Sequence, residues 1–402
     1  MNLFPFLLLI LCLPFGPSLQ SIAIGIATFT ILIRDRAGLK TLAQKIGRKE
    51  GISLGLLLAV IVLPIISTLL NSKNPETDVI SFFFGFAPLL IVPILFLIQR
   101  PIPREGREKL ELVWTFLMIF WAVAALSQHI WGWKIQGVSL VHGDFFKRSQ
   151  GFYSHPLTLA YVSLMLYPFH LVLLAADFKN WRRIALLLGN LALLYFSASR
   201  TAQAVALLAT AGFALSYFKG RTRIYLLTAM TVAMIGVFST PNAISRRFSA
   251  MSSGMLSEEK ESAYADDRIA FWIVHLNMVK ERPILGHGIN LDKTYRVPYY
   301  DAIGLPGFKK AYEAHNQILQ IAAEGGIVAA IAFLAWLVSL HFNWRNGSKN
   351  LAFIRDLTLI CLFLGGLTQN AYFDGEVRFA LMTLLSFLYA SGLHSKQAEV
   401  RV

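Results

Sequence analysis

Residues 314–343 read AHNQILQIAAEGGIVAAIAFLAWLVSLHFN, a long apolar run that begins with the polar pair His315–Asn316. A helix of about 20 apolar residues crosses the roughly 30 Å hydrocarbon core of a membrane. The run from 316 to 343 therefore predicts a membrane-spanning helix. Since the polar pair then lies at the boundary between membrane and water, His315 is either part of a helix cap or a reactive group.

The rest of the chain repeats this apolar pattern. Of its 402 residues, 55% are hydrophobic and 15% charged, whereas a soluble domain carries about 25% charged residues. We keep the first apolar run as a membrane helix, because its start has no basic region and no small-residue cleavage site follows it. The sequence predicts an all-α integral membrane protein with about twelve spanning helices. The expected spans are 3–14, 17–33, 51–70, 79–98, 111–131, 156–176, 184–199, 202–218, 224–239, 316–343, 357–373 and 379–393.

The positions of Lys and Arg predict the topology, because short basic loops stay in the cytoplasm. Basic residues gather in alternate connections, which places both termini inside and the long segment 240–315 outside. In a bacterium this segment faces the periplasm and the protein lies in the inner membrane. We therefore expect three parts: spans one to nine in 1–239, a periplasmic loop domain in 240–315, and the last three spans with a cytoplasmic tail in 316–402. The net charge of +14 reflects the inner loops and requires no nucleic acid partner.

The outward segment contains one clear helical pattern. Residues 266–283 carry apolar side chains at helical spacing, followed by Pro283, and 294–316 reads as an irregular piece. We expect the apolar face of this helix to lie on the membrane surface or to pack on the bundle. That face comprises Ile269, Trp272, Ile273, Leu276 and Val279.

Three arginines fall on the predicted outer side. Arg200 lies between two apolar runs with almost no connecting loop, Arg268 begins the outward helix, and Arg148 precedes the sixth span. Ionisable residues at membrane depth are functional candidates, and a guanidinium is a forked donor matched to phosphate oxygens. The alternatives are a snorkelling anchor for Arg200 and, for Arg268, a salt bridge to Asp266 or to a neighbouring loop.

His315 is the candidate base. Histidine side chains ordinarily titrate near pH 6.5, which suits proton transfer at neutral pH. Asn316 and Gln320 supply amides around it, and Asn316 is also a good helix cap. Histidine and carboxylate spacings favour no metal site, and both cysteines, Cys12 and Cys361, lie in apolar runs. No cofactor is expected.

Three stretches together resemble the O-antigen ligase family of the polysaccharide polymerase and ligase superfamily. They are SASRTA (197–202), DDRIAFWIVHLNMVKERPILGHGIN (266–290) and AHNQILQIAAEGG (314–326), in this order on about twelve spans. A family pattern of His, then Asn, Ser or Gln, then nine residues and Gly is similar to His315, Asn316 and Gly326. Family arginines correspond to Arg200 and Arg268.

The resemblance implies a membrane glycosyltransferase of the GT-C type. Such an enzyme transfers a glycan from undecaprenyl diphosphate to the lipid A–core of lipopolysaccharide. We expect Arg200, Arg268 and Arg148 to bind the diphosphate, His315 to act as base, and Asn316 and Gln320 to support it, in an inverting reaction without metal. A repeat-unit polymerase, an O-oligosaccharyltransferase and a transporter of a lipid-linked sugar remain alternatives.

Overall fold

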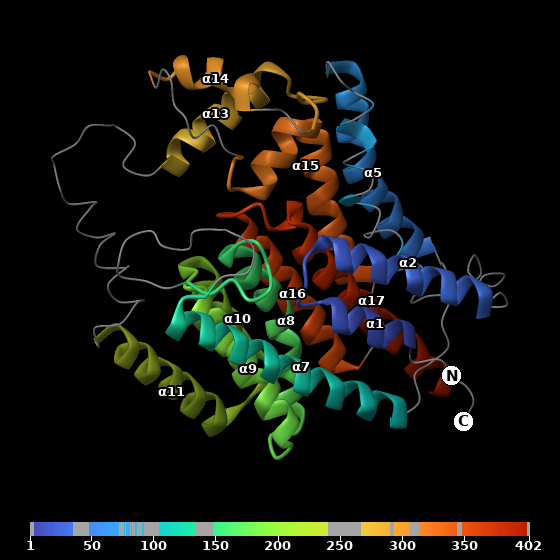
Figure 1. Ribbon diagram of the computed structural model, residues 1–402, viewed down its shortest axis with the longest axis vertical. Helices are drawn as coiled ribbons and strands as arrows, with labels where there is room; N and C mark the ends of the chain where they lie inside the picture. The colour runs from blue at the N-terminus through green and yellow to red at the C-terminus, as the bar shows by residue number, and fades with distance from the viewer. Residues whose placement is uncertain are drawn as a thin grey trace.

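The protein is built from helices (Figure 1). The computed structural model describes residues 4–34, 48–71, 104–133, 148–239, 267–289, 293–304, 313–343 and 348–399, with scattered positions between 76 and 91. Every regular element in these ranges is helical, which confirms the all-α class. The elements are α1 (Phe4–Cys12), α2 (Pro17–Arg34), α5 (Arg48–Asn71), α7 (Arg104–Trp131), α8 (Pro156–Ala176), α9 (Trp181–Ser197), α10 (Arg200–Tyr217), α11 (Gly220–Ser239), α13 (Asp267–Glu281), α14 (Lys293–Asp301), α15 (Gln317–Asn343), α16 (Lys349–Gly366), the 3₁₀ helix η1 (Ala371–Phe373) and α17 (Gly375–Glu399).

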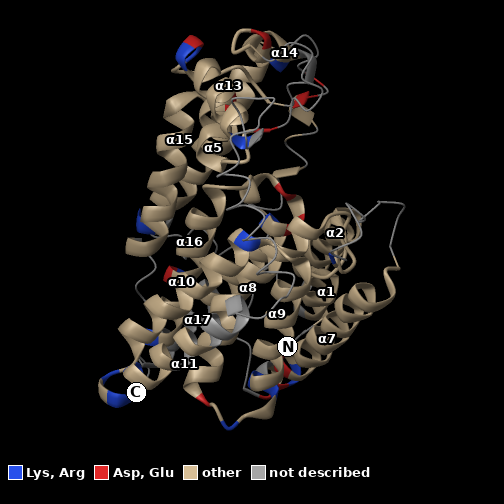
Figure 2. Ribbon diagram, turned by 90° about the vertical axis from the view of Figure 1, so that its left-hand side faces the viewer, with Lys and Arg blue, Asp and Glu red and all other residues tan. Residues whose placement is uncertain are grey.

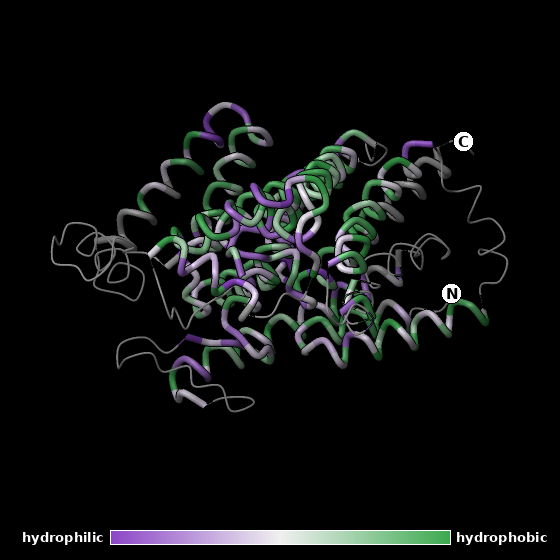
Figure 3. The backbone as a smooth tube through the Cα atoms, turned by 90° about the horizontal axis from the view of Figure 1, so that it is seen from above, coloured by the Kyte–Doolittle hydropathy of each residue, from purple (hydrophilic) through white to green (hydrophobic). Residues whose placement is uncertain are grey.

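Several of these helices suit a membrane. Among the described residues, four stretches are long and apolar enough to cross one: Gly51–Asn71, Glu108–Trp131, Pro156–Ala176 and Gln317–Phe342. Charged residues occur at both ends of the molecule and also in a group at mid-height (Figure 2), and the long helices are largely hydrophobic (Figure 3). The chain is therefore a membrane protein with several apolar helices. The number twelve stays a prediction, and the expected span 79–98 lies mostly outside the described residues.

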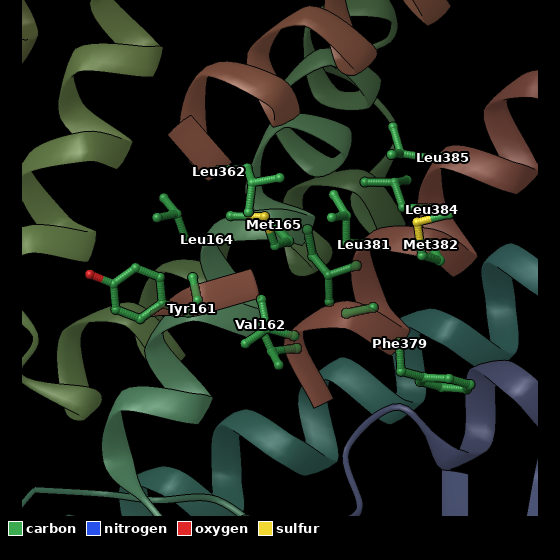
Figure 4. Packing of buried hydrophobic residues seen from close by; sticks show 14 of the residues in the cluster. Tyr161, Val162, Leu164, Met165, Leu362, Phe379, Leu381, Met382, Leu384 and Leu385 are labelled. Atoms are coloured by element: carbon green, nitrogen blue, oxygen red, sulfur yellow. The ribbon is translucent and has the colours of Figure 1, made fainter. Parts of the chain in front are cut away.

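The core forms around α8. Helices α9, α16 and α17 pack against it. Val162 and Met165 on α8 have no exposed surface. Leu362 on α16 and Leu381 on α17 are equally buried, so distant parts of the chain contribute to one core. Figure 4 shows these side chains interdigitating. Since lipid is as apolar as leucine, such a core is held by close packing and not by exclusion of water.

The outer helices present apolar side chains to their surroundings. Phe116 and Val123 on α7 and Leu188 on α9 are 59%, 56% and 60% exposed. In the spanning window of α7 only 39% of residues are buried, compared with 67% in that of α8. The periphery of the bundle is thus suited to contact hydrocarbon.

The expected span 357–373 is wrong at both ends. Helix α16 begins at Lys349 and stops at Gly366, and η1 begins only at Ala371. Gly366 touches the side chain of Gln317 so closely that an added Cβ overlaps the Gln317 amide. Apolar residues stand on both sides of the short polar stretch 368–370, so hydropathy alone did not predict that the helix ends before it.

The helix expected within 266–283 is present as α13, and only part of its apolar surface packs on the bundle. The side chains that pack towards α15 and α14 are those of Ala270, Phe271, Val274 and Met278. Ile269 and Leu276 of the expected apolar face are each 47% exposed, so contact of that face with a membrane surface stays a prediction. The helix is apolar around most of its circumference, and Ala270 together with Ala323 on α15 allows the closer approach. The segment expected to be irregular also contains a helix, α14.

Candidate active site

Two of the arginines meet at the turn between α9 and α10. Ala198 closes α9 in the left-handed conformation, with φ of 51°, and Ser199 caps α10 through its hydroxyl. Arg200 is therefore the first residue of α10, where free backbone N–H groups favour anions. The Arg148 Nε donates to the carbonyl of Ser197 at 3.0 Å. The structure thus brings Arg148 and Arg200 to one turn, and the position of this turn on the outer side of a membrane stays a prediction.

The third arginine, Arg268, lies in the first turn of α13. It precedes Phe271 by three residues, and residues three apart share a helix face. The Phe271 ring lies 5.4 Å from the His315 ring, centroid to centroid. Arg268 is also an electrostatic neighbour of Tyr161 on α8, which in turn lies beside Thr201. Figure 4 shows the Tyr161 hydroxyl directed away from the aliphatic core. The Tyr161 hydroxyl donates to the Gly365 carbonyl at 3.3 Å, and Tyr161 thus lies close to Arg268, to Thr201 near the start of α10 and to the end of α16.

His315 has an unusual backbone. Its φ is 47°, in the left-handed region, where residues other than glycine are uncommon and Asn, Asp and His are enriched. Such strain persists where the surroundings enforce it, often at functional sites. The His315 Nδ1 lies 2.9 Å from the Oε1 of Gln369. Asn316, not His315, caps α15, because its Oδ1 accepts from the N–H groups of Ile318 and Leu319, each at 3.1 Å.

Four side-chain bonds join residues 313–317 to residues 367–372, and we name this arrangement the polar clamp. The pairs are Glu313 Oε2 with Asn370 Nδ2 at 2.9 Å, His315 with Gln369, Asn316 Nδ2 with the Leu367 carbonyl at 3.2 Å, and Gln317 Oε1 with the Tyr372 N–H at 3.3 Å. The clamp connects the end of α16 to the beginning of α15. The residues before and after His315 are thereby bonded to the segment 367–372.

Gln320 supports the turn from below. Its Oε1 accepts the N–H of Ala314 at 2.8 Å, and its Nε2 donates to Glu324 Oε1 at 2.6 Å. Both side chains are buried. Gln320 therefore orders the residue before His315 and does not itself approach the arginines through any bond described here. Its expected supporting role stays a prediction.

Helix α15 is broken at Gly326, the last residue of the family pattern. Gly326 has φ of 81° and ψ of 171°, so it cannot continue the helix. Backbone groups beside the break form hydrogen bonds with the segment after α13. The Ile327 N–H donates to the Pro283 carbonyl at 2.8 Å. The carbonyls of Ala323 and Glu324 accept from the N–H groups of His287 and Gly288, at 2.9 Å each. We name this exchange the backbone junction. It satisfies backbone groups at membrane depth and ties the outward segment to α15.

Sequence reasoning missed His155. This residue caps α8 by accepting the Leu157 N–H at its Nδ1, over 3.1 Å, and it is exposed. Desolvation by neighbouring protein and then the charge of Arg148 lower the pKa of His155, whereas the Asp374 carboxylate raises it; His315 lowers it further. Its Nδ1 accepts the cap bond, and no bond between His155 and His315 is described. The sequence does not indicate that His155 lies near Asp374 and His315, because these residues are distant along the chain and meet only in the folded protein.

The other histidines of the outward segment are less suited to proton transfer. Burial, and next the charge of Arg296, lower the pKa of His275 to about 3, so its ring stays neutral. Burial also lowers the pKa of His287, whose Nε2 donates to the Met278 carbonyl while its Nδ1 accepts from Tyr295. Both rings bond to backbone carbonyls within the outward segment, and His315 stays the candidate base.

The described residues contain no group of three or more His, Cys, Asp or Glu that could hold a metal ion. The arrangement instead offers guanidinium groups and one imidazole. Such a set can bind a phosphate-bearing ligand and accept a proton.

A family model described as O-antigen ligase matches residues 184–334. No curated protein matches the chain. The matched range includes the α9–α10 turn, α13, His315 and the Gly326 break, while Arg148 and Gln369 lie outside it. The match supports the resemblance expected from the sequence: residues 184–334 of this chain are similar to the O-antigen ligase family.

Proposed function

We propose that the protein is an O-antigen ligase, which transfers a glycan from undecaprenyl diphosphate to a hydroxyl of the lipid A–core oligosaccharide. The proposal is supported by the placement of Arg148 at the turn that carries Arg200, and of Arg268 near Tyr161 and three residues before Phe271, whose ring lies beside His315. Neither a cofactor nor a metal ion takes part. The enzyme acts as a GT-C-type glycosyltransferase in the bacterial inner membrane, with the site facing the periplasm.

The chemistry follows from the two kinds of side chain. Arg200, Arg268 and Arg148 bind the diphosphate, and their contacts strengthen as negative charge grows on the departing group. The acceptor oxygen attacks the anomeric carbon, the bond from that carbon to the diphosphate oxygen breaks, and the hydroxyl proton moves to His315. Direct displacement inverts the anomeric configuration. Phe271 covers the His315 ring and limits access of water, which would otherwise compete as acceptor.

We assign the loop domain 240–315 to the acceptor side. It faces the periplasm, and the backbone junction fixes the described part of it to α15. Donor and acceptor are both lipids, so both reach the site from the membrane plane. The residues of 240–266 and 305–312 lie outside the described structure, so the contribution of these segments rests on the sequence alone.

Lysine in place of Arg200 or Arg268 is expected to reduce ligation about 100-fold. A lysine keeps the charge but cannot form the two parallel bonds that a guanidinium makes to a phosphate. The measurement is the initial rate of glycan transfer by purified protein with saturating acceptor. Arg182→Lys is the matched control, because Arg182 lies over Trp181 at the far end of α9, 6.0 Å from the ring centroid. Full activity of both test variants contradicts a role in binding diphosphate.

A strain lacking the gene tests the function itself. We expect its lipopolysaccharide to migrate as bare core in electrophoresis, while polymer accumulates on the lipid carrier. Complementation by the wild-type gene restores the ladder. Core bearing a single repeat unit identifies a polymerase instead, and loss of polymer from the periplasmic side of the membrane identifies a transporter.

A further inference from the structure

Gln369 is a residue to which neither the sequence pattern nor the family domain assigns a role. It lies in the turn 367–370 between α16 and η1, outside the matched range 184–334. Its Oε1 is 2.9 Å from the His315 Nδ1, and this is the one side-chain contact described for that nitrogen. The position is that of the third group in a base-orienting arrangement, where a reactive imidazole is held by the nitrogen that does not react.

The contact determines which tautomer His315 adopts. An amide oxygen can only accept a hydrogen bond, so the proton of the neutral ring must be on Nδ1. The lone pair is then on Nε2, the atom left to take a proton. Without Gln369 the neutral ring distributes its proton between the two nitrogens, and one of these forms cannot act as a base at Nε2.

The turn that carries Gln369 is itself held firmly. The residues on either side of it are bonded by the polar clamp: Asn316 binds the Leu367 carbonyl, and Asn370 binds Glu313 and approaches Gln320 at 3.5 Å. The Thr368 N–H also returns to the Gly365 carbonyl at 3.3 Å. A side chain on such a fixed backbone can hold the imidazole in one orientation, which a mobile loop cannot do.

We propose that Gln369 is a positioning residue that fixes His315 as the Nδ1–H tautomer and so makes Nε2 the base for the acceptor hydroxyl. This role rests on the proposed function, since it concerns the same proton transfer. It adds a residue that acts through His315, without contact to either substrate.

The first test does not require ligase activity. Protein labelled with ¹⁵N only in histidine is compared with labelled His315→Asn, and the difference gives the His315 ring signals. We expect the shifts of a protonated Nδ1 and an unprotonated Nε2 at high pH. In Gln369→Glu the new carboxylate favours the imidazolium, so the pH midpoint of these signals should rise by about one unit or more. A midpoint that does not move, or a protonated Nε2 in the parent protein, overturns the proposal even where the protein proves not to be a ligase.

The second test uses the reaction. Gln369→Met keeps the length of the side chain but removes the acceptor, and kcat should fall about 10- to 100-fold, the loss usual when a group that orients a reactive side chain is removed. The KM for donor should stay nearly constant. In Gln369→Glu the acid limb of the kcat profile should move to higher pH with the NMR midpoint.

A double-mutant cycle separates positioning from a general effect on structure. In the His315→Asn background, Gln369→Met should cause little further loss, because the group through which it acts is gone. Additive losses in the double variant mean that Gln369 serves the fold and not the base. Ligase activity that is absent from every variant, including the parent, contradicts the proposed function and leaves the NMR result to decide the tautomer.

Discussion

His315→Asn is expected to lose about two orders of magnitude or more in turnover while binding the donor lipid nearly as well as the parent. A general base contributes about 10²–10⁴ to rate, and asparagine has no nitrogen that can accept the proton. The substitution is chosen for the backbone: His315 has φ of 47°, a conformation that asparagine tolerates better than alanine does. The measurement is kcat for glycan transfer, with donor binding determined separately on the same preparation.

The result distinguishes two roles for this turn. Asn316 already caps α15 through Ile318 and Leu319, so the cap remains in the variant. Asparagine at 315 also keeps an oxygen and an amide near Gln369. Near-normal turnover at equal amounts of folded protein therefore removes His315 from the chemistry and leaves the arginines as a binding site only.

Gly326→Ala is expected to prevent the protein from reaching its folded state, or to destabilise it by more than about 3 kcal/mol. The backbone of Gly326 has φ of 81° and ψ of 171°, a combination nearly restricted to glycine. A Cβ added there also overlaps the carbonyl of Ile284, which is backbone and has no rotamer with which to retreat. The measurement is the yield and thermal stability of the purified protein in detergent.

Gly212→Ala is the matched control. Gly212 lies within α10, and a Cβ built on it has no neighbour within 4 Å. Because alanine is the better helix former by about 1 kcal/mol, this variant should be as stable as the parent or more so. A Gly326→Ala protein with unchanged stability contradicts the account of the backbone junction given above.

The all-α class and most helix positions were predictable, because a long apolar run in a membrane must satisfy its own backbone hydrogen bonds, which a helix does. Helices α2, α10 and α11 lie within a few residues of their expected spans. The prediction failed where glycine and close packing compete with hydropathy. At the end of α16, Gly366 and its contact with Gln317 stop the helix although the sequence stays apolar up to Leu367. On α13, the sequence left open whether the apolar face meets a membrane surface or the bundle, and the residues that contact α15 are known only from the structure.

The sequence pointed to the arginines and His315 of the candidate site, but not to the residues that surround His315. Arginine at membrane depth and histidine at a helix start are unusual enough to be noticed in a sequence. Gln369 and His155 are ordinary residues in their local context, and they gain meaning only when α16 and α8 bring them beside His315. Asn316 was expected either to assist or to cap, and its two backbone bonds show that it caps.

The backbone junction has a consequence for how the protein is made. Within the hydrocarbon, an unsatisfied N–H or C=O group costs several kcal/mol. Until residues 283–288 dock, the broken backbone at Gly326 exposes such groups of Ala323, Glu324 and Ile327. Since residues 283–288 leave the ribosome before Gly326, they can already be across the membrane when α15 enters it. With the segment 240–315 on the outer side, as the sequence predicts, stable insertion of α15 requires prior translocation of the preceding segment, and a delay in that export leaves α15 without its partner.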